Sequence, residues 1–430
     1  MPGLLIAAPA SAQGKTTVTL GLLRALTRKG VQVVSGKSGP DYIDPAFHAA
    51  ATGAPCLTLD SWAASPEQLR ARAAMRGGEA LVVEGAMGLA DGAAGEPAGG
   101  RGSALALAQA LDLEVVLVVD AARMGQSIAA IVRGFDGFGG VPLAGVILNR
   151  VGSERHAAML RTAIGQACPV LGILPRRADL ELPSRHLGLV QATEQGDLEA
   201  VLDRAADWVA GGCDLDLLGK MAGGRSQAGA TAPARLPPLG QRIAIARDQA
   251  FGFSYWHMLE DWRAQGAELS FFSPLADGGP GNHADAVFLP GGYPELHAGV
   301  LAEAGTFQDD LRAAAERGAL IWGECGGYMV MGEGLVDADG VAHRMTGLLP
   351  LETSFAERMR HLGYRRLDCM AGPWIGPLMG HEFHYATTLR ADGAPLFEAR
   401  DAEGTRLLPM GLVQGRVMGS FAHVIEQGVR

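Results

Sequence analysis

The first residues with a clear chemical pattern are Gly14, Lys15, Thr16 and Thr17. They follow a short apolar run and open a segment with helical periodicity. At such a helix start, backbone N–H groups bind phosphate, the lysine neutralises its charge and a hydroxyl reaches Mg²⁺. The pattern therefore predicts a nucleotide site. Because Pro9 replaces the first glycine of the usual motif, an ordinary turn with a surface lysine is the alternative.

Charged residues also stand next to two other predicted strands. Glu84 ends an apolar strand at the sheet edge where α/β proteins bind ligands, so it is a candidate Mg²⁺ ligand or water holder, and Asp91 could face the same pocket. Lys37 comes just after the second strand and could neutralise phosphate charge. Asp41 and Asp44 lie between two prolines and suggest metal or substrate contact. The alternative for Glu84 is a structural carboxylate that caps the turn after its strand. The alternative for Asp41 and Asp44 is a turn that the two aspartates cap.

In the second half, Cys325 follows an apolar strand in the segment LIWGECGG. A cysteine on a sharp strand-to-helix turn is a nucleophile elbow with sulfur in place of oxygen. The N–H of Gly326 could serve an oxyanion hole, with a second donor from Gly291 or Gly292, which also follow a strand. A buried structural cysteine is the alternative.

A thiol nucleophile needs a base, and histidine is the usual one. His423 near the C-terminus is the leading candidate. His361, His381 and His384 remain open alternatives, because a histidine is more often a structural or surface group.

Short strands that alternate with helical segments must position these residues. Strands are predicted at 4–8, 31–34, 81–83, 114–119, 144–148, 170–174, 242–246, 267–272, 286–289, 320–322 and 416–418, and a helix at 16–28. This alternation predicts parallel, doubly wound α/β sheets whose strands are mostly buried on both faces. A Gly-, Ala-, Ser- and Pro-rich stretch divides the chain into domains at 1–221 and 241–430, joined by a linker at 222–240.

Composition limits the function. The 430 residues carry 36 Lys and Arg against 46 Asp and Glu, a net charge of −10, which argues against nucleic-acid binding. No apolar run is long enough to span a membrane. The five cysteines are widely spaced without a CxxC motif, which indicates a reducing, cytoplasmic compartment.

Several motifs resemble known families. The second domain resembles the triad-type glutamine amidotransferases, and the whole chain is similar to the a,c-diamide synthases of cobalamin biosynthesis. The motifs of this resemblance are GKTTVT at 14–19, KSGPDYIDPAFH at 37–48, TLDSW at 58–62, VVEGAMGLADG at 82–92, LPSRHLGL at 182–189, LPGGYPE at 289–295, GECGGYM at 323–329, GHEFHY at 380–385 and GSFAHVIE at 419–426.

The resemblance implies a P-loop synthetase domain similar to dethiobiotin synthetase and a flavodoxin-like glutaminase domain. Cys325 would attack glutamine with His423 as its base, and the ammonia released would amidate two corrin carboxylates activated by ATP and Mg²⁺. Common amidotransferases carry a Glu two residues past this histidine, where this chain has Ile425, and Glu426 follows. The departure favours a Cys–His dyad and leaves the role of Glu426 open.

The resemblance also implies ligands in the first domain. The set comprises Gly14, Lys15, Thr16, Thr17, Lys37 and Asn149 for ATP, with Asn149 at the adenine; Thr16, Asp41 and Glu84 for the metal; and Asp41, Tyr42, Ile43 and Asp91 for the substrate.

Two other functions compete. One is a cobyric acid synthase that amidates other corrin carboxylates, and the GPDYIDP and LPSRHLGL motifs argue against it. The other is a P-loop scaffold ATPase with a non-catalytic amidotransferase domain. The Arg-biased, Ala- and Gly-rich composition indicates a GC-rich bacterium and favours metal-free hydrogenobyrinic acid over cobalt-containing cobyrinic acid. The sequence leaves monomer and homodimer open.

Overall fold

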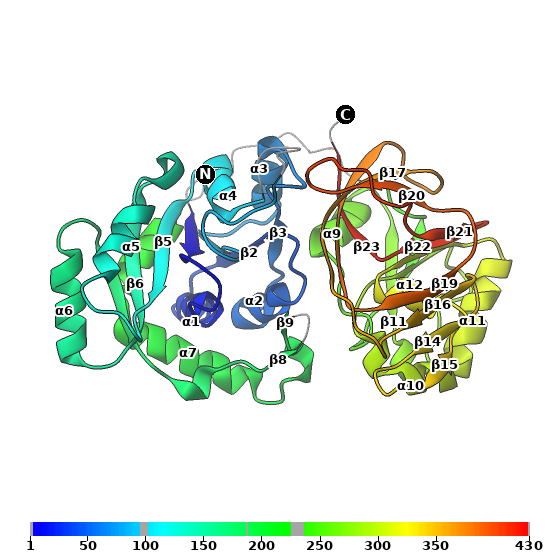
Figure 1. Ribbon diagram of the computed structural model, residues 1–430, viewed down its shortest axis with the longest axis horizontal. Coiled ribbons are helices and arrows are strands. Elements are labelled where there is room, and N and C mark those ends of the chain that lie inside the picture. Colours follow the sequence, from blue (N-terminus) through cyan, green and yellow to red (C-terminus); the bar gives the residue numbers. More distant parts are fainter. Residues whose placement is uncertain (1–2, 95–101, 186–187, 225–235, 429–430) are drawn as a thin grey trace. The chain divides into compact units, whose positions relative to one another are not determined.

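The computed structural model describes residues 3–94, 102–185, 188–224 and 236–428 (Figure 1). The chain divides into two compact units, Met1–Pro233 and Ala234–Arg430. The predicted linker at 222–240 falls largely on residues 225–235, which lie outside the described residues.

Unit 1 is built on a seven-stranded sheet in the order β3-β2-β4-β1-β5-β6-β7, and all its neighbouring strands are parallel. The strands are β1 (Leu4–Ala7), β2 (Val33–Ser38), β3 (Leu57–Leu59), β4 (Ala80–Glu84), β5 (Glu114–Asp120), β6 (Leu143–Val151) and β7 (Val170–Pro175), with a small hairpin of β8 (Ser184–Arg185) and β9 (Gly188–Leu189). The central strands β1 and β4 are buried along their whole length, as expected for a sheet with helices on both faces.

The helices of this unit are α1 (Lys15–Arg28), α2 (Asp44–Thr52), α3 (Pro66–Ala74), α4 (Ala104–Leu111), α5 (Ile128–Phe135), α6 (Glu154–Ile164), α7 (Leu198–Gly212) and α8 (Leu215–Ala222). Helix α1 packs against α7 and α2, and Figure 1 shows these three below the sheet and α3 and α4 above it. The strand β1, the loop after it and α1 therefore form the predicted strand–loop–helix unit.

Two predictions about residue placement in this sheet are wrong. Lys37 does not follow the second strand, because β2 continues to Ser38 and Lys37 pairs in register with Glu84 of β4. Asn149 likewise lies within β6, paired with Asp120 of β5. Both strands run further than their apolar cores because their polar ends have partners in the neighbouring strand. The three-residue strand β3 was not predicted.

Unit 2 contains a six-stranded sheet in the order β11-β10-β12-β13-β22-β21, parallel except for β21. Its strands are β10 (Arg242–Ala246), β11 (Glu268–Phe272), β12 (Ala286–Leu289), β13 (Leu320–Glu324), β21 (Leu412–Gln414) and β22 (Val417–Ser420). Its helices are α9 (Trp256–Ala264), α10 (Ala298–Glu303), α11 (Gly305–Glu316) and α12 (Gly326–Val330). Both units thus have the predicted α/β class, although the edge strand β11 is largely exposed.

Two four-stranded sheets in this unit were not predicted. One has the order β15-β14-β16-β19 and the other β20-β17-β18-β23. Their strands are β14 (Gly334–Val336), β15 (Ala342–Arg344), β16 (Leu351–Ser354), β17 (His361–Cys369), β18 (Pro377–His384), β19 (Thr387–Ala391), β20 (Phe397–Arg400) and β23 (Ala422–Gln427). The second sheet carries all four histidines considered as bases.

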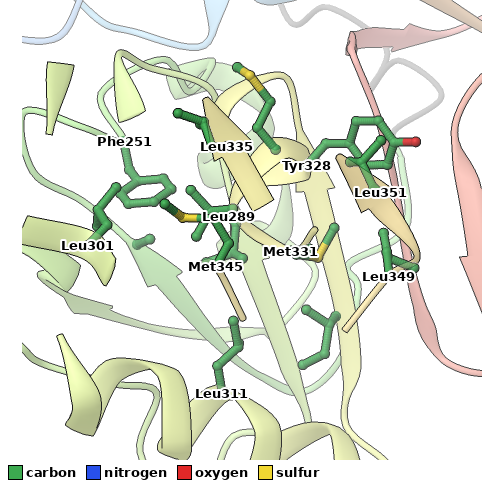
Figure 2. Close-up of a cluster of buried hydrophobic side chains, with 14 of the residues drawn as sticks. Phe251, Leu289, Leu301, Leu311, Tyr328, Met331, Leu335, Met345, Leu349 and Leu351 are labelled. Atoms are coloured by element: carbon green, nitrogen blue, oxygen red, sulfur yellow. The ribbon is translucent and has the colours of Figure 1, made fainter. Parts of the chain in front are cut away.

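Apolar side chains from β12, β13, α10, α11 and α12 form one buried cluster (Figure 2). Leu289, Met331 and Tyr328 lie in this cluster, which also includes Cys325. The strand-to-helix turn that carries the cysteine is therefore anchored on close-packed side chains, which fix its backbone.

No helix among the described residues combines the length and the apolar character needed to cross a membrane. All five cysteines are free thiols, and three of them are buried.

Candidate functional site

The predicted phosphate loop joins β1 to α1 in unit 1. Gly14 caps the helix in the left-handed region (φ 84°). A Cβ there would lie 2.3 Å from Asn149 Nδ2, so both the backbone conformation and the space require glycine. The N–H groups of the first helical turn have no partners within the helix and carry the positive end of its dipole.

The side chain of Lys15 reaches across to the loop that follows β4. Its amine donates a hydrogen bond to the carbonyl of Met87, a residue with φ 52°. Burial lowers the pKa of Lys15, and the nearby charge of Lys37 lowers it further against the attraction of Glu84. Thr17 lies in the same helical turn and is half-buried.

Glu84 is the centre of a buried cluster of polar groups. One carboxylate oxygen accepts hydrogen bonds from Thr16 Oγ1 at 2.7 Å and Lys37 Nζ at 2.9 Å, and the other lies 2.7 Å from His48 Nε2. Burial raises the pKa of Glu84, but Lys37 and His48 outweigh it and hold the pKa far below its usual value. Thr16 and Glu84, both predicted metal ligands, are thus in direct contact.

The same cluster extends to Asp44, which accepts a hydrogen bond from Lys37 Nζ at 2.6 Å. Burial opposes the charge on Lys37, but Asp44, Glu84 and Asp41 outweigh it and raise the pKa of the lysine. Asp44 was predicted only as a metal or substrate contact, and His48 was missing from the predicted site. Their spacing of four residues, on one face of α2, is the signal that could have found them.

The predicted substrate residues surround this cluster less closely. Asp41 caps the start of α2, because its Oδ1 accepts hydrogen bonds from the N–H groups of Ile43 and Asp44, and its Oδ2 lies 3.8 Å from Lys37. Tyr42 and Ile43 are buried. The carboxylate of Asp91 accepts a hydrogen bond from the N–H of Gly88 at 2.9 Å and so closes the loop after β4.

Asn149 contacts the phosphate loop from β6. Its amide nitrogen donates to the carbonyl of Gln13 at 2.9 Å, and its amide oxygen accepts from the N–H of Arg150. Arg150 in turn donates to the carbonyl of Ala12. These contacts show Asn149 holding the loop in place.

In unit 2, Cys325 has the strained geometry of a nucleophile elbow. It links β13 to α12 with φ 48° and ψ −106°, an uncommon conformation for a residue other than glycine. Burial and the carboxylate of Glu295 raise the pKa of the thiol against the opposing N–H of Gly326. The resting side chain is therefore a neutral thiol that needs a base.

His423 at the start of β23 borders the same space as this thiol. A Cβ on Gly291 would lie 2.4 Å from His423 Cε1 and 3.1 Å from Cys325 Cβ, so only a hydrogen atom fits between the two side chains. Burial, with His381 and His384, lowers the pKa of His423 to about 3, so the ring is neutral and can accept a proton.

The glycines predicted for the oxyanion hole meet at this point. A Cβ on Gly326 would lie 3.0 Å from the backbone nitrogen of Gly292. The backbone of Gly326 therefore lies next to the N–H of Gly292, one of the two candidates for the second donor.

The other three histidines have different surroundings. His381 pairs in register with His423 across β18 and β23, and His384 stacks on Phe421 with ring centroids 3.9 Å apart and on His361 at 4.6 Å. His384 Nε2 also lies 3.0 Å from Glu382, whose other oxygen accepts hydrogen bonds from Arg365.

Comparison with known proteins covers both units. Residues 4–190 match the CobQ/CobB/MinD/ParA nucleotide binding domain, and residues 242–428 match the CobB/CobQ-like glutamine amidotransferase domain. Among curated relatives, the hydrogenobyrinate a,c-diamide synthase of Sinorhizobium sp is 58% identical over 99% of both chains. The proteins of the same name from Brucella anthropi and Rhodobacter capsulatus are 57% and 54% identical over 99% and 98% of both chains. With full-length identity at this level, the chain belongs to the family of the hydrogenobyrinate a,c-diamide synthases.

Proposed function

We propose that this protein converts the a and c carboxylates of hydrogenobyrinic acid into amides, with glutamine as the nitrogen donor and ATP as the energy source. The observation that carries the proposal is the pair of complementary sites in one chain. A buried, strained Cys325 borders His423 in unit 2. In unit 1, Glu84 lies beside the start of α1 after the phosphate loop and contacts Lys37 of β2. The names of the full-length relatives supply the substrate.

Unit 2 would release ammonia from glutamine. The sulfur of Cys325 attacks the side-chain amide carbon while the thiol proton moves to His423, and the carbonyl electron pair moves onto oxygen. The N–H groups of Gly326 and of Gly291 or Gly292 would stabilise that oxyanion. The C–N bond then breaks, the leaving nitrogen takes the proton from His423, and water hydrolyses the thioester to glutamate.

Unit 1 would activate the corrin carboxylate. A carboxylate oxygen takes the γ-phosphoryl group of ATP, and ammonia then displaces phosphate from the acyl phosphate to form the amide. Phosphoryl transfer depends on positioning and charge neutralisation, which the helix start with Gly14 and Thr17, together with Lys15 and Lys37, would supply.

The metal site is part of the same proposal. The Thr16 hydroxyl and Glu84 carboxylate, 2.7 Å apart, are oxygen ligands suited to Mg²⁺, and Asp41 would add a third from the nearby loop. A bound Mg²⁺ would neutralise charge on the β- and γ-phosphates. Asp41, Tyr42, Ile43 and Asp91 would line the carboxylate, and Asn149 would lie beside the adenine while it holds the loop.

A cytoplasmic location, with no nucleic-acid or membrane partner, belongs to the same proposal. The five free thiols and the net charge of −10 support it.

The test is mass spectrometry of hydrogenobyrinic acid and cobyrinic acid, each incubated with the protein, ATP, Mg²⁺ and glutamine. We expect two amidations on the metal-free ring. Two amidations on cobyrinic acid alone would support the proposed reaction but would show that the cobalt-containing ring is the substrate. Amidation of other carboxylates would favour the cobyric acid synthase reaction, and ATP hydrolysis without any amidation would favour the scaffold ATPase.

A further inference from the structure

Glu324, the residue before the nucleophile, is a buried carboxylate to which the proposed chemistry gives no role. It ends β13, is 1% exposed and lies close to His423, which is 99 positions further along the chain. Burying a carboxylate in a protein interior is costly unless its oxygens have partners. The contacts of the Glu324 side chain must therefore offset this cost.

The two oxygens of Glu324 have different contacts. Oε1 accepts hydrogen bonds from the indole N–H of Trp322 at 3.1 Å and the backbone N–H of Val424 at 3.2 Å. Oε2 lies 3.7 Å from Nδ1 of His423. Two hydrogen-bond donors therefore hold Oε1 in place, while Oε2 faces the ring of the proposed base, His423.

We propose that Glu324 is the positioning residue for His423, in place of the Glu that common amidotransferases carry two residues past the histidine. With Nδ1 protonated and directed at Oε2, the opposite nitrogen, Nε2, is the one left to take the thiol proton. The carboxylate would also stabilise the imidazolium that forms when the proton moves. The present distance is long for a hydrogen bond, as is common at such sites before the substrate binds.

The residues around His423 explain why Glu324 can take this positioning role. Ile425 stands where the usual Glu would be, and it has no polar group to orient a ring. Glu426, the next residue, accepts a hydrogen bond from the N–H of its neighbour Gln427 at 3.2 Å. Glu324 comes instead from the neighbouring parallel sheet, where β13 and β22 pair Glu324 with Ser420, three residues before the histidine.

The carboxylate also affects the resting thiol. Burial raises the pKa of Glu324 itself to about 8, against the N–H donors of Trp322 and Val424. When it is ionised, its charge is among the causes that raise the pKa of Cys325, so it works against a free thiolate. The Glu324 carboxylate favours the thiolate only after the thiol proton has moved to His423, because the carboxylate then faces a protonated ring. The cysteine would thus be activated through the histidine and not by the local electrostatic field.

The test uses the full-length protein and rests on the proposed glutaminase reaction. We compare Glu324→Gln, Glu324→Asp and Glu426→Gln, with Glu398→Gln on the exposed face of β20 as the control. Glutaminase kcat and KM are measured, together with the rate at which a diazoketone glutamine analogue labels Cys325 and with amidation supported by ammonium.

We expect Glu324→Gln to lower kcat and the labelling rate by about 100-fold, with KM within about 3-fold and ammonium-dependent amidation unchanged. Glu324→Asp should recover part of the loss, and both other variants should match the wild type. Equal kcat in Glu324→Gln and wild type would overturn the inference, as would a loss found only in Glu426→Gln. A wild type without glutaminase activity would instead reject the proposed function.

A variant that fails to fold is recognised by its loss of ammonium-dependent amidation together with a lowered Tm. In that case Glu324→Asp, which keeps the charge, decides. In this variant the carboxylate is one methylene further from the ring. Glutaminase activity at the wild-type level would therefore contradict a positioning role.

Discussion

Glu84 accepts a hydrogen bond from Thr16 at 2.7 Å, although 68 positions separate the two residues in the chain. The sheet makes this contact, because β1 and β4 are neighbours and Ile6 pairs with Glu84 in register. The carboxyl end of β4 therefore lies beside the loop that starts α1. This relationship places an acidic oxygen, a hydroxyl and two lysines at one edge of the sheet, and the predictions for unit 1 depend on it.

Lys15→Ala should reduce amidation by roughly 100-fold with either glutamine or ammonium, because a preorganised charge is lost at the phosphates. Glutamine hydrolysis measured alone should persist. The control is Lys29→Ala, which removes an exposed lysine at the end of the same helix. Amide formation is measured by mass spectrometry. Full amidation by a folded Lys15→Ala protein would refute the phosphate role.

Cys325→Ala should abolish amidation from glutamine and leave amidation from ammonium intact, since the thiol acts only in making ammonia. Cys369→Ala, at a half-buried thiol in β17, is the matched control. Product formation is followed with each nitrogen source at several concentrations. If a folded Cys325→Ala protein also loses the ammonium reaction, the division into two sites is wrong.

Gly291→Ala should abolish glutaminase activity. The added methyl group would lie 2.4 Å from His423 Cε1 and 3.1 Å from Cys325 Cβ, so one of these side chains must move. Overpacking of this kind also costs about 1–3 kcal/mol of stability. In Gly305→Ala, at the start of α11, the methyl group meets no atom within 4 Å. Wild-type glutaminase activity in Gly291→Ala would show that the space between the two side chains is not constrained.

The pair of His48 and Glu84 predicts a pH-dependent stability for unit 1. Burial opposes the charge on His48, but Cys56 and Glu84 outweigh it and raise its pKa from 6.5 to about 10. A raised pKa means that the stabilisation is fully present below pH 6.5 and is lost as the pH rises through 10. Breaking such a buried pair costs about 3–5 kcal/mol.

His48→Gln should therefore destabilise unit 1 strongly at pH 6.5 and much less at pH 10. Hydrogen exchange of peptides from α2 and β4 in urea measures this unit separately from unit 2. The same loss of stability at both pH values would mean that His48 stabilises the fold by packing and not by its charge.

The sequence was informative wherever a motif coincided with a buried strand. The loop of Gly14 and Lys15 and the elbow of Cys325 both follow apolar strands, so strand periodicity placed them at sheet edges. Glycines beside the cysteine marked a close approach of backbone. Because these signals are local, a single sequence is enough to read them.

The contacts that the sequence did not reveal are long-range. Asp44 and His48 reach Lys37 and Glu84 only because α2 packs beside β2, and nothing in their local pattern specifies a partner. Glu324 is next to Cys325 in the chain, yet its contact with His423 depends on the pairing of β13 with β22. Strand β17 was missed because its residues are mostly half-buried or exposed. Strand β18 was missed because glycine, histidine and glutamate interrupt its buried residues, so they form no apolar run.

The central claim is that glutamine nitrogen released at Cys325 becomes the amide nitrogen of the corrin. The most direct test incubates hydrogenobyrinic acid with the protein, ATP, Mg²⁺ and glutamine labelled with ¹⁵N in its amide, in the presence of unlabelled ammonium, and determines the product mass. We predict two new amides, both carrying ¹⁵N in the wild type and both unlabelled in Cys325→Ala. Absence of amides from both reactions, or the same labelling in wild type and variant, would contradict the account.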